Sequence, residues 1–408
     1  MTGRLNYTDL GQKGAIGVTE ANRLPVCAGH NSQFGESIVA NRTAIIELNS
    51  SYGPSLQRDV VTVTNSATVV KSGTGEIALS TGATASSTAR INSAARVGYI
   101  PGYSCEIGIG VRIPVAPTGN QLVRWGILNP QSDEGLYFGA DVLGLFAEVN
   151  RGGVKITERQ QNWNIDRLNG EGPSGLRIGL SDGTIFHIEY TWYGYGQVLF
   201  GIVAIVNGTQ QFWPCHSFKV NGGTSIQTPN LPISVDASNG AGAGVFEVYL
   251  GGRQASIIGQ NIPNIRVTGQ ERLPAATSTT TRPLISFRAK IGFEDRTIRL
   301  ANILDSVTGQ NHVMEIYLNA TLTGAVFVNP ANKTAAETCL EADISATAQT
   351  GGVLIYSSFG INSTPQRTIL NNKNSKLDVP ENQIVTLSAR TVTGTGTATA
   401  FLQMEEEW

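Results

Sequence analysis

Several side chains in this sequence have the chemistry of acid–base catalysis. His187 and Glu189 lie two positions apart in a segment that alternates apolar and polar residues, so a strand would present both on one face. A polar pair of this kind more often lies on the outer face of a sheet without a catalytic role, which is the interpretation that we favour. The other glutamates on expected strands are isolated in the sequence: Glu106, Glu148 and Glu247.

The spacing of the carboxylates argues against a glycan hydrolase. A retaining glycanase needs two carboxyl groups about 5 Å apart, which acidic residues at alternate positions of one strand can supply. The sequence contains no such run. Gly108 and Gly110 lie inside an expected strand and do not form a dinucleotide-binding fingerprint. We therefore expect no catalytic residues, no cofactor and no enzymatic activity.

A metal site is not predicted either. Cys215 and His216 are adjacent, and neighbours on a strand point to opposite faces, so the pair cannot readily bind one ion. The four cysteines are far apart and form no CxxC pair, so we expect buried free thiols. Four residues could form a calcium site on a rim loop, although solvated turn residues are the favoured interpretation: Asp133, Glu134, Asp141 and Asn150.

Aromatic side chains are the best candidates for binding. Exposed Tyr and Trp rings stack on sugars and also anchor protein interfaces. Strand alternation places Tyr190 and Trp192 on one face, which we expect to be the core. We predict glycan or partner contact at Tyr193, Tyr195 and Trp213, and we favour core or subunit packing over glycan binding.

The composition indicates many short strands joined by tight turns. The 408 residues include 47 glycines, and only 15% are charged, against about 25% in an average soluble domain. The formal net charge of −2 provides no basic field for nucleic acid. The sequence lacks an apolar stretch typical of a membrane span, and its first residues lack the apolar core of a signal peptide. We expect synthesis in a cytoplasm, with neither nucleic acid nor membrane as a partner.

The elements that would position these side chains are strands. Residues 105–114 alternate cleanly, and residues 186–192 and 198–206 read as two strands of a hairpin that turns at residues 193–196. Further short apolar runs fill residues 52–268, without a convincing amphipathic helix. This pattern predicts two packed sheets. A second set of runs in residues 282–408 predicts a smaller sandwich.

The chain divides into four predicted segments. Residues 1–50 form a polar N-terminal arm that would gain order by packing on a neighbour. Residues 51–270 form a large jelly-roll sandwich, and residues 282–408 form the smaller C-terminal β-sandwich. Between them, residues 271–281 are rich in Pro, Ser and Thr and read as a linker, or as an extended strand lying across a neighbour.

A series of short motifs follows the same order as in a known family. The motifs are LSTG at 79–82, YIPG at 99–102, NWNIDRLNG at 162–170, GPSG at 172–175, YTWYGYG at 190–196, TPNLPI at 228–233, LNATLTG at 318–324 and MEEEW at 404–408. This order resembles tailed-phage virion proteins, most of which have no assigned function. The resemblance covers most of residues 52–408. It implies a concanavalin- or laminin-G-like jelly roll followed by a smaller β-sandwich, and it supplies no catalytic residues.

These features predict a non-enzymatic structural component of a bacteriophage virion. It would be an outward-facing capsid decoration or cement protein, or a fibre-type protein, that acts by assembly and surface contact. Exposed sheet edges need covering, so we expect a homo-oligomer, with a trimer favoured, and other capsid, neck or tail proteins as partners. The main alternative is a lectin-like module that recognises a host-surface glycan. A third possibility, a polysaccharide depolymerase, would need a carboxylate pair.

Overall fold

A computed structural model describes most of the chain beyond its first forty residues. The described residues are 42–98, 102–129, 133–191, 193–206, 209–259, 266–293, 296–369, 377–380 and 382–407, together with the short strands β1 (Arg4–Asn6) and β2 (Ala15–Gly17). Nearly all regular structure in these residues is β, apart from the single 3-10 turn η2 (Gln160–Asn162). The predicted all-β class is therefore confirmed. No helix in the described part of the chain has the length and apolar character needed to cross a membrane.

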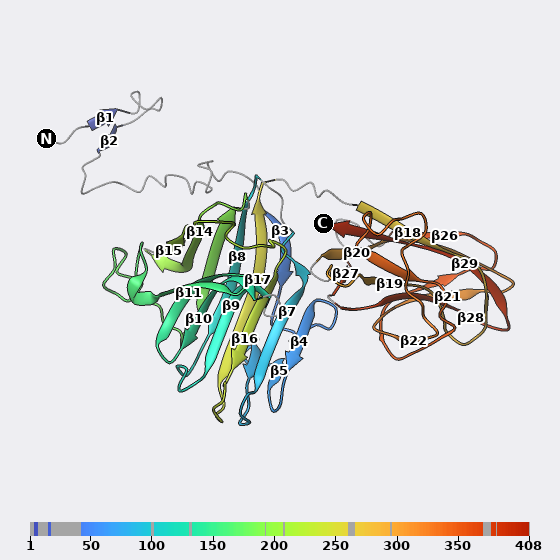
Figure 1. Ribbon diagram of the computed structural model, residues 1–408, viewed down its shortest axis with the longest axis horizontal. Helices are drawn as coiled ribbons and strands as arrows, with labels where there is room; N and C mark the ends of the chain where they lie inside the picture. The colour runs from blue at the N-terminus through green and yellow to red at the C-terminus, as the bar shows by residue number, and fades with distance from the viewer. Residues whose placement is uncertain are drawn as a thin grey trace.

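The large sandwich consists of two antiparallel sheets (Figure 1). The seven-stranded sheet has the order β12-β11-β10-β9-β16-β7-β4, and the eight-stranded sheet has the order β15-β14-β13-β8-β17-β6-β5, with β3 paired to β17. The first sheet contains β4 (Asp59–Val63), β7 (Thr88–Arg96), β9 (Leu122–Asn129), β10 (Glu134–Asp141), β11 (Gly144–Arg151), β12 (Val154–Arg159) and β16 (Pro232–Ser238). The second contains β3 (Arg42–Leu48), β5 (Thr68–Lys71), β6 (Ile77–Ser80), β8 (Ser104–Arg112), β13 (Thr184–Thr191), β14 (Val198–Val206), β15 (Thr209–Phe218) and β17 (Glu247–Ile258).

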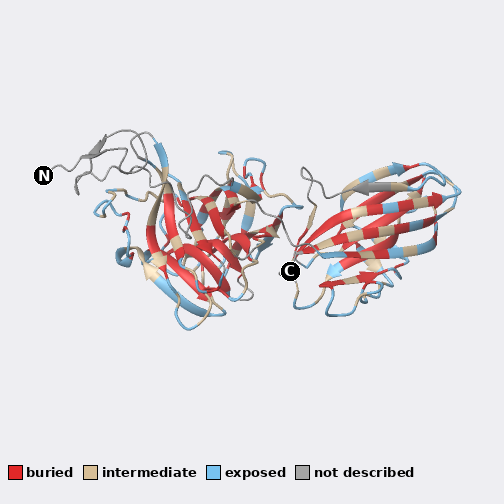
Figure 2. Cartoon of the chain, turned by 90° about the horizontal axis from the view of Figure 1, so that it is seen from above, coloured by how far each residue is buried: buried red, intermediate tan, exposed pale blue. Residues whose placement is uncertain are grey.

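Strand alternation forms the core of this sandwich. Buried residues follow the strands of both sheets, whereas most exposed residues lie on loops and outer faces (Figure 2). Aromatic rings from β9 and β10 meet rings from β13 and β14. The ring centroids of Trp125 and Phe186 are 4.8 Å apart, and those of Phe138 and Phe200 are 5.0 Å apart. These edge-to-face contacts hold the two sheets together.

The C-terminal sandwich is built in the same way from two five-stranded sheets. One contains β18 (Arg266–Thr277), β20 (Thr297–Thr308), β26 (Gln366–Ile369), β27 (Asp378–Val379) and β29 (Gly396–Glu407). The other contains β19 (Arg282–Ala289), β21 (His312–Leu318), β23 (Leu340–Asp343), β25 (Val353–Gly360) and β28 (Val385–Thr391). A small pair, β22 (Thr321–Thr323) and β24 (Ala348–Thr350), accompanies them.

Two predicted segments need correction. Residues 42–48, assigned to the N-terminal arm, form β3 and pair with β17 of the large sandwich. Residues 271–277, assigned to the linker, belong to β18, which pairs with β29 and starts at Arg266, before the predicted end of the jelly roll. Pro274 is accommodated because β18 is an edge strand, and its register shifts between Arg272 and Ala275.

Candidate functional site

The three aromatic residues predicted to bind do not lie together. Tyr193 and Tyr195 are 60% and 71% exposed in the turn between β13 and β14. Trp213 instead pairs with Ile202 on β14 and packs against the core. Trp213 is five positions from Phe218, the end of β15 nearest that turn. Five positions along a strand correspond to roughly 15 Å. Contact with a glycan or partner stays a prediction for all three.

The predicted core positions can also be located. Tyr190 is buried, as predicted, whereas Trp192 lies outside the described residues. The three described cysteines are buried and free, and Cys27 lies outside the described residues. His216 accepts a hydrogen bond at Nδ1 from the Asn164 amide, 3.1 Å away.

The four possible calcium ligands do not converge on one point. Asn150 donates to Asp133 over 3.2 Å, whereas the carboxylate of Glu134 accepts backbone amides of Gly152 and Gln227. Asp141 lies at the other end of β10 and forms an ion pair with Arg159 at 2.6 Å. The residues therefore do not form a single calcium site in this structure.

The strands β8 and β13 bring together residues that the sequence shows as separate. Glu106, which is isolated in the sequence, lies directly opposite Glu189 in the antiparallel ladder. His187 Nε2 is 3.2 Å from Glu189 Oε1 and 3.6 Å from Glu106 Oε2. We call Glu106, His187 and Glu189 the carboxylate–histidine cluster. It lies on the outer face of the eight-stranded sheet, because the alternate residues Cys105, Ile107 and Ile188 face the core.

Two of the three residues in the cluster, Glu106 and His187, are buried although the cluster faces outward. Glu106 is 3% and His187 is 9% exposed, and the ring of Phe212 lies 4.7 Å from the imidazole. Arg42 on β3 donates from Nη2 to Glu106 Oε2 over 2.9 Å. Burial raises the pKa of Glu106, whereas the charges of His187 and Arg42 act in the opposite direction. Two carboxylates directly opposite on neighbouring strands repel each other, so this arrangement favours a proton or a cation between them.

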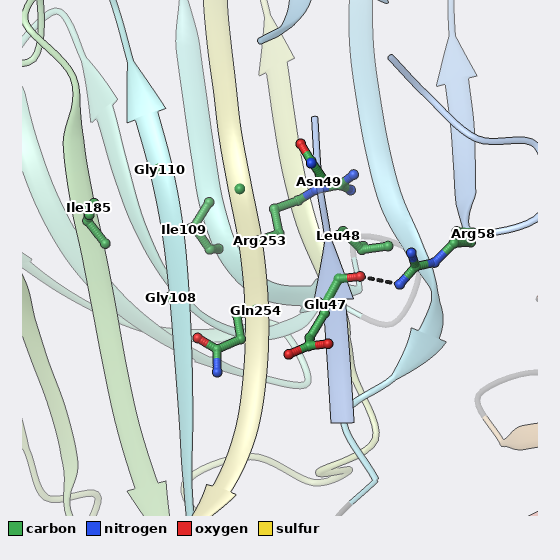
Figure 3. A pocket seen from close by; sticks show the side chains of 11 residues that line it. Glu47, Leu48, Asn49, Arg58, Gly108, Ile109, Gly110, Ile185, Arg253 and Gln254 are labelled. Atoms are coloured by element: carbon green, nitrogen blue, oxygen red, sulfur yellow. Dashed lines mark hydrogen bonds between the residues drawn. The ribbon is translucent and has the colours of Figure 1, made fainter. Parts of the chain in front are cut away.

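A hollow of about 670 Å³ adjoins the cluster. Gly108 forms part of its floor and pairs with His187 on one side and with Gln254 on the other. A Cβ atom at Gly108 would have no atom within 4 Å, so the missing side chain leaves this floor open. Figure 3 shows the lining side chains and the hydrogen bond from Arg58 to the carbonyl of Glu47.

The rim of the hollow combines polar and apolar groups. Glu47, Asn49, Arg58 and Gln254 supply hydrogen-bond donors and acceptors, and Ile185 supplies an apolar wall. Ligand pockets typically measure about 300–1,000 Å³ and place a few polar groups around an apolar surface. The hollow can therefore take a small ligand that has hydroxyl groups and an apolar face.

Sequence reasoning missed this hollow. The alternating Gly108 and Gly110 were visible, but their outward direction and the neighbours of their strand were not. Only the pairing of β8 with β13 and β17 shows that Gly108 borders the carboxylate–histidine cluster.

No protein-family model and no curated protein matches the sequence. Among solved structures, the lectin I-B4 of Griffonia simplicifolia aligns with 53% of this chain and all of its own, at 11% identity and a TM-score of 0.33. The β-glucanase of Bacillus licheniformis aligns with 55% of this chain and all of its own, at 8% identity and a TM-score of 0.33. The CBM2 module of the evolved Dit of Lactobacillus casei BL23 phage J-1 aligns with 55% of this chain and 99% of its own, at 11% identity and a TM-score of 0.36. Likeness at this level carries no functional conclusion.

Proposed function

We propose that the chain is a non-enzymatic surface component of a bacteriophage virion whose large sandwich binds a glycan. The observation that supports glycan binding is the hollow over Gly108, with its polar rim and the apolar side chain of Ile185. A sugar ring has hydroxyl groups at its edge and C–H groups on its face, which match a polar rim and an apolar surface. The bound glycan would lie on the outer face of the eight-stranded sheet.

Filling the hollow tests this proposal. Gly108→Leu should be tolerated, because its Cβ position is open. The full chain should bind a host-polysaccharide glycan array, and Gly108→Leu should weaken that binding by roughly tenfold or more. Gly73→Leu is the matched control, since Gly73 also has open space around its Cβ position and does not line the hollow. Equal binding by the two variants would contradict the hollow as the site.

The turn that carries Tyr193 and Tyr195 offers a second place for a glycan. Both rings are well exposed, and aromatic rings stack on sugars. Loss of array binding in Tyr193→Ala or Tyr195→Ala, with Gly108→Leu unaffected, would move the site to this turn. Binding lost only in Gly108→Leu would leave the hollow as the glycan site.

The virion role is supported by the order of motifs between residues 79 and 408, which resembles that of tailed-phage virion proteins. The protein would be a capsid decoration or a fibre-type protein, made in the host cytoplasm and assembled as a trimer. Light scattering of the full chain and of a variant lacking residues 1–41 tests the assembly. The deletion ends there because β3 begins at Arg42. A trimer lost with the arm would support assembly through it, whereas monomers in both forms would contradict the trimer.

The proposal excludes hydrolysis, although Glu106 and Glu189 face each other. Glu106 is 3% exposed, and Arg42 forms an ion pair with its carboxylate, so a glycosidic oxygen has little access to it. Purified protein should release no reducing sugar from host capsule. Release that disappears in Glu189→Gln would show that the protein is an enzyme.

A further inference from the structure

We propose that Glu106, His187 and Glu189 bind one divalent transition-metal ion, with Zn²⁺ as the best fit. This site is distinct from the proposed glycan hollow, although the two are adjacent. Within the described residues, the cluster is the one group of at least three His, Cys, Asp or Glu side chains that could hold a metal. Its three ligand atoms all lie within 4.8 Å of one another.

The distances in the cluster match those around a tetrahedral ion. Two ligands that are each 2.0–2.2 Å from such an ion are about 3.3–3.6 Å apart. His187 Nε2 lies 3.2 Å from Glu189 Oε1 and 3.6 Å from Glu106 Oε2. The remaining edge, between the two carboxylates, is within 4.8 Å and can shorten by rotation of a carboxylate. Little rearrangement is needed to bring all three atoms onto one ion.

The donor set and the charge select the ion. One imidazole nitrogen and two carboxylate oxygens suit Zn²⁺, whereas Ca²⁺ takes six to eight oxygen ligands. A divalent cation would also neutralise the two carboxylates that β8 and β13 place opposite each other. The contact of Phe212 with the imidazole restricts the orientation of His187.

Arg42 is a competitor for this site. Its guanidinium forms an ion pair with Glu106, but its own side chain is 56% exposed and can move into solvent. A metal ion at Glu106 would displace that positive charge. Removing the guanidinium should therefore strengthen metal binding, whereas removing a ligand should weaken it.

Calorimetric titration of the full chain with ZnCl₂ tests these opposite effects. We expect one Zn²⁺ per chain, with roughly tenfold or greater loss of affinity in Glu189→Gln and His187→Gln. Arg42→Gln should bind more tightly than the unaltered chain. Glu171→Gln is the control, because it removes the same charge as Glu189→Gln from an exposed loop and should leave affinity unchanged. CaCl₂ should not compete with Zn²⁺.

Two results would overturn the metal site. One is Zn²⁺ affinity that is equal in His187→Gln and in the unaltered chain. The other is no binding of millimolar Zn²⁺ by Arg42→Gln, provided that its far-ultraviolet circular dichroism shows a folded protein. Gly108→Leu retains all three ligands and should keep Zn²⁺ affinity within a few-fold. Its titration therefore separates failure of the metal site from failure of the glycan site.

Discussion

Two buried glutamates, one in each sandwich, are held in opposite ways. Glu406 on β29 is fully buried, and its carboxylate accepts hydrogen bonds from the hydroxyls of Thr268 and Thr338 and from the amide of Cys339. Glu106 on β8 is almost as buried, but its partners are Arg42 and His187, and a second carboxylate faces it. A carboxylate whose hydrogen-bond donors are neutral and fixed in place stabilises the fold. One whose partners can titrate or move away can exchange them for a ligand.

The largest expected effect is on stability, and it concerns Glu406. Glu406→Ala would leave donors from β18 and from the segment before β23 unsatisfied inside the C-terminal sandwich. We expect a loss of about 3–5 kcal/mol in the free energy of unfolding of that sandwich, because each buried unsatisfied group costs about 1–3 kcal/mol. Urea unfolding of the full chain would measure it. A loss below about 1 kcal/mol would mean that Glu406 is not a structural residue of the C-terminal sandwich.

Zn²⁺ should stabilise the large sandwich and leave the C-terminal one unchanged. A ligand at 100 times its dissociation constant adds about 2.7 kcal/mol to the stability of the folded state that binds it. Differential scanning calorimetry with and without Zn²⁺ would show which transition moves. The shift should vanish in His187→Gln and persist in Glu171→Gln. A shift of the C-terminal transition instead would mean that Zn²⁺ binds the C-terminal sandwich and not the carboxylate–histidine cluster.

A smaller effect is expected for Glu106→Gln without metal, and it should depend on pH. A raised folded-state pKa means that the native protein holds the Glu106 proton more tightly than the unfolded chain. This contribution to stability is complete below the unfolded pKa and is lost as pH rises through the folded pKa. The amide cannot titrate, so Glu106→Gln should gain stability relative to the unaltered chain across that window.

Urea midpoints of both proteins between pH 4 and pH 8 would check this sign. The groups that face Glu106 are Arg42, His187 and Glu189, and all three are the same in both proteins. A variant that loses relative stability as pH rises would mean that Glu106 is a satisfied structural carboxylate like Glu406.

Local patterns predicted the strands, whereas long-range pairing determined the site. The alternation at residues 105–114 and 186–192 corresponds to β8 and β13. It could be recognised because the alternation of a strand involves only consecutive residues. The contact of Glu106 with Glu189 depends on the register between two strands that are far apart in the chain. The strand β18 was missed for a different reason: Pro274 and its Ser/Thr-rich surroundings resemble a linker, and only an edge position tolerates that proline.

The smallest stability effect is expected at the turn between β13 and β14, whose exposed rings are candidates for binding and not for structural support. Tyr193→Ala and Tyr195→Ala remove rings that are mostly exposed, so each should change the free energy of unfolding by no more than about 0.5 kcal/mol. Urea unfolding would measure this, with Tyr190→Ala as the contrasting variant, because Tyr190 is buried on the neighbouring strand and should cost about 3–5 kcal/mol. A large loss in Tyr195→Ala would mean that the turn serves structure. Its rings would then resemble Glu406 in role, and the hollow beside Glu106 would be the stronger candidate for recognition.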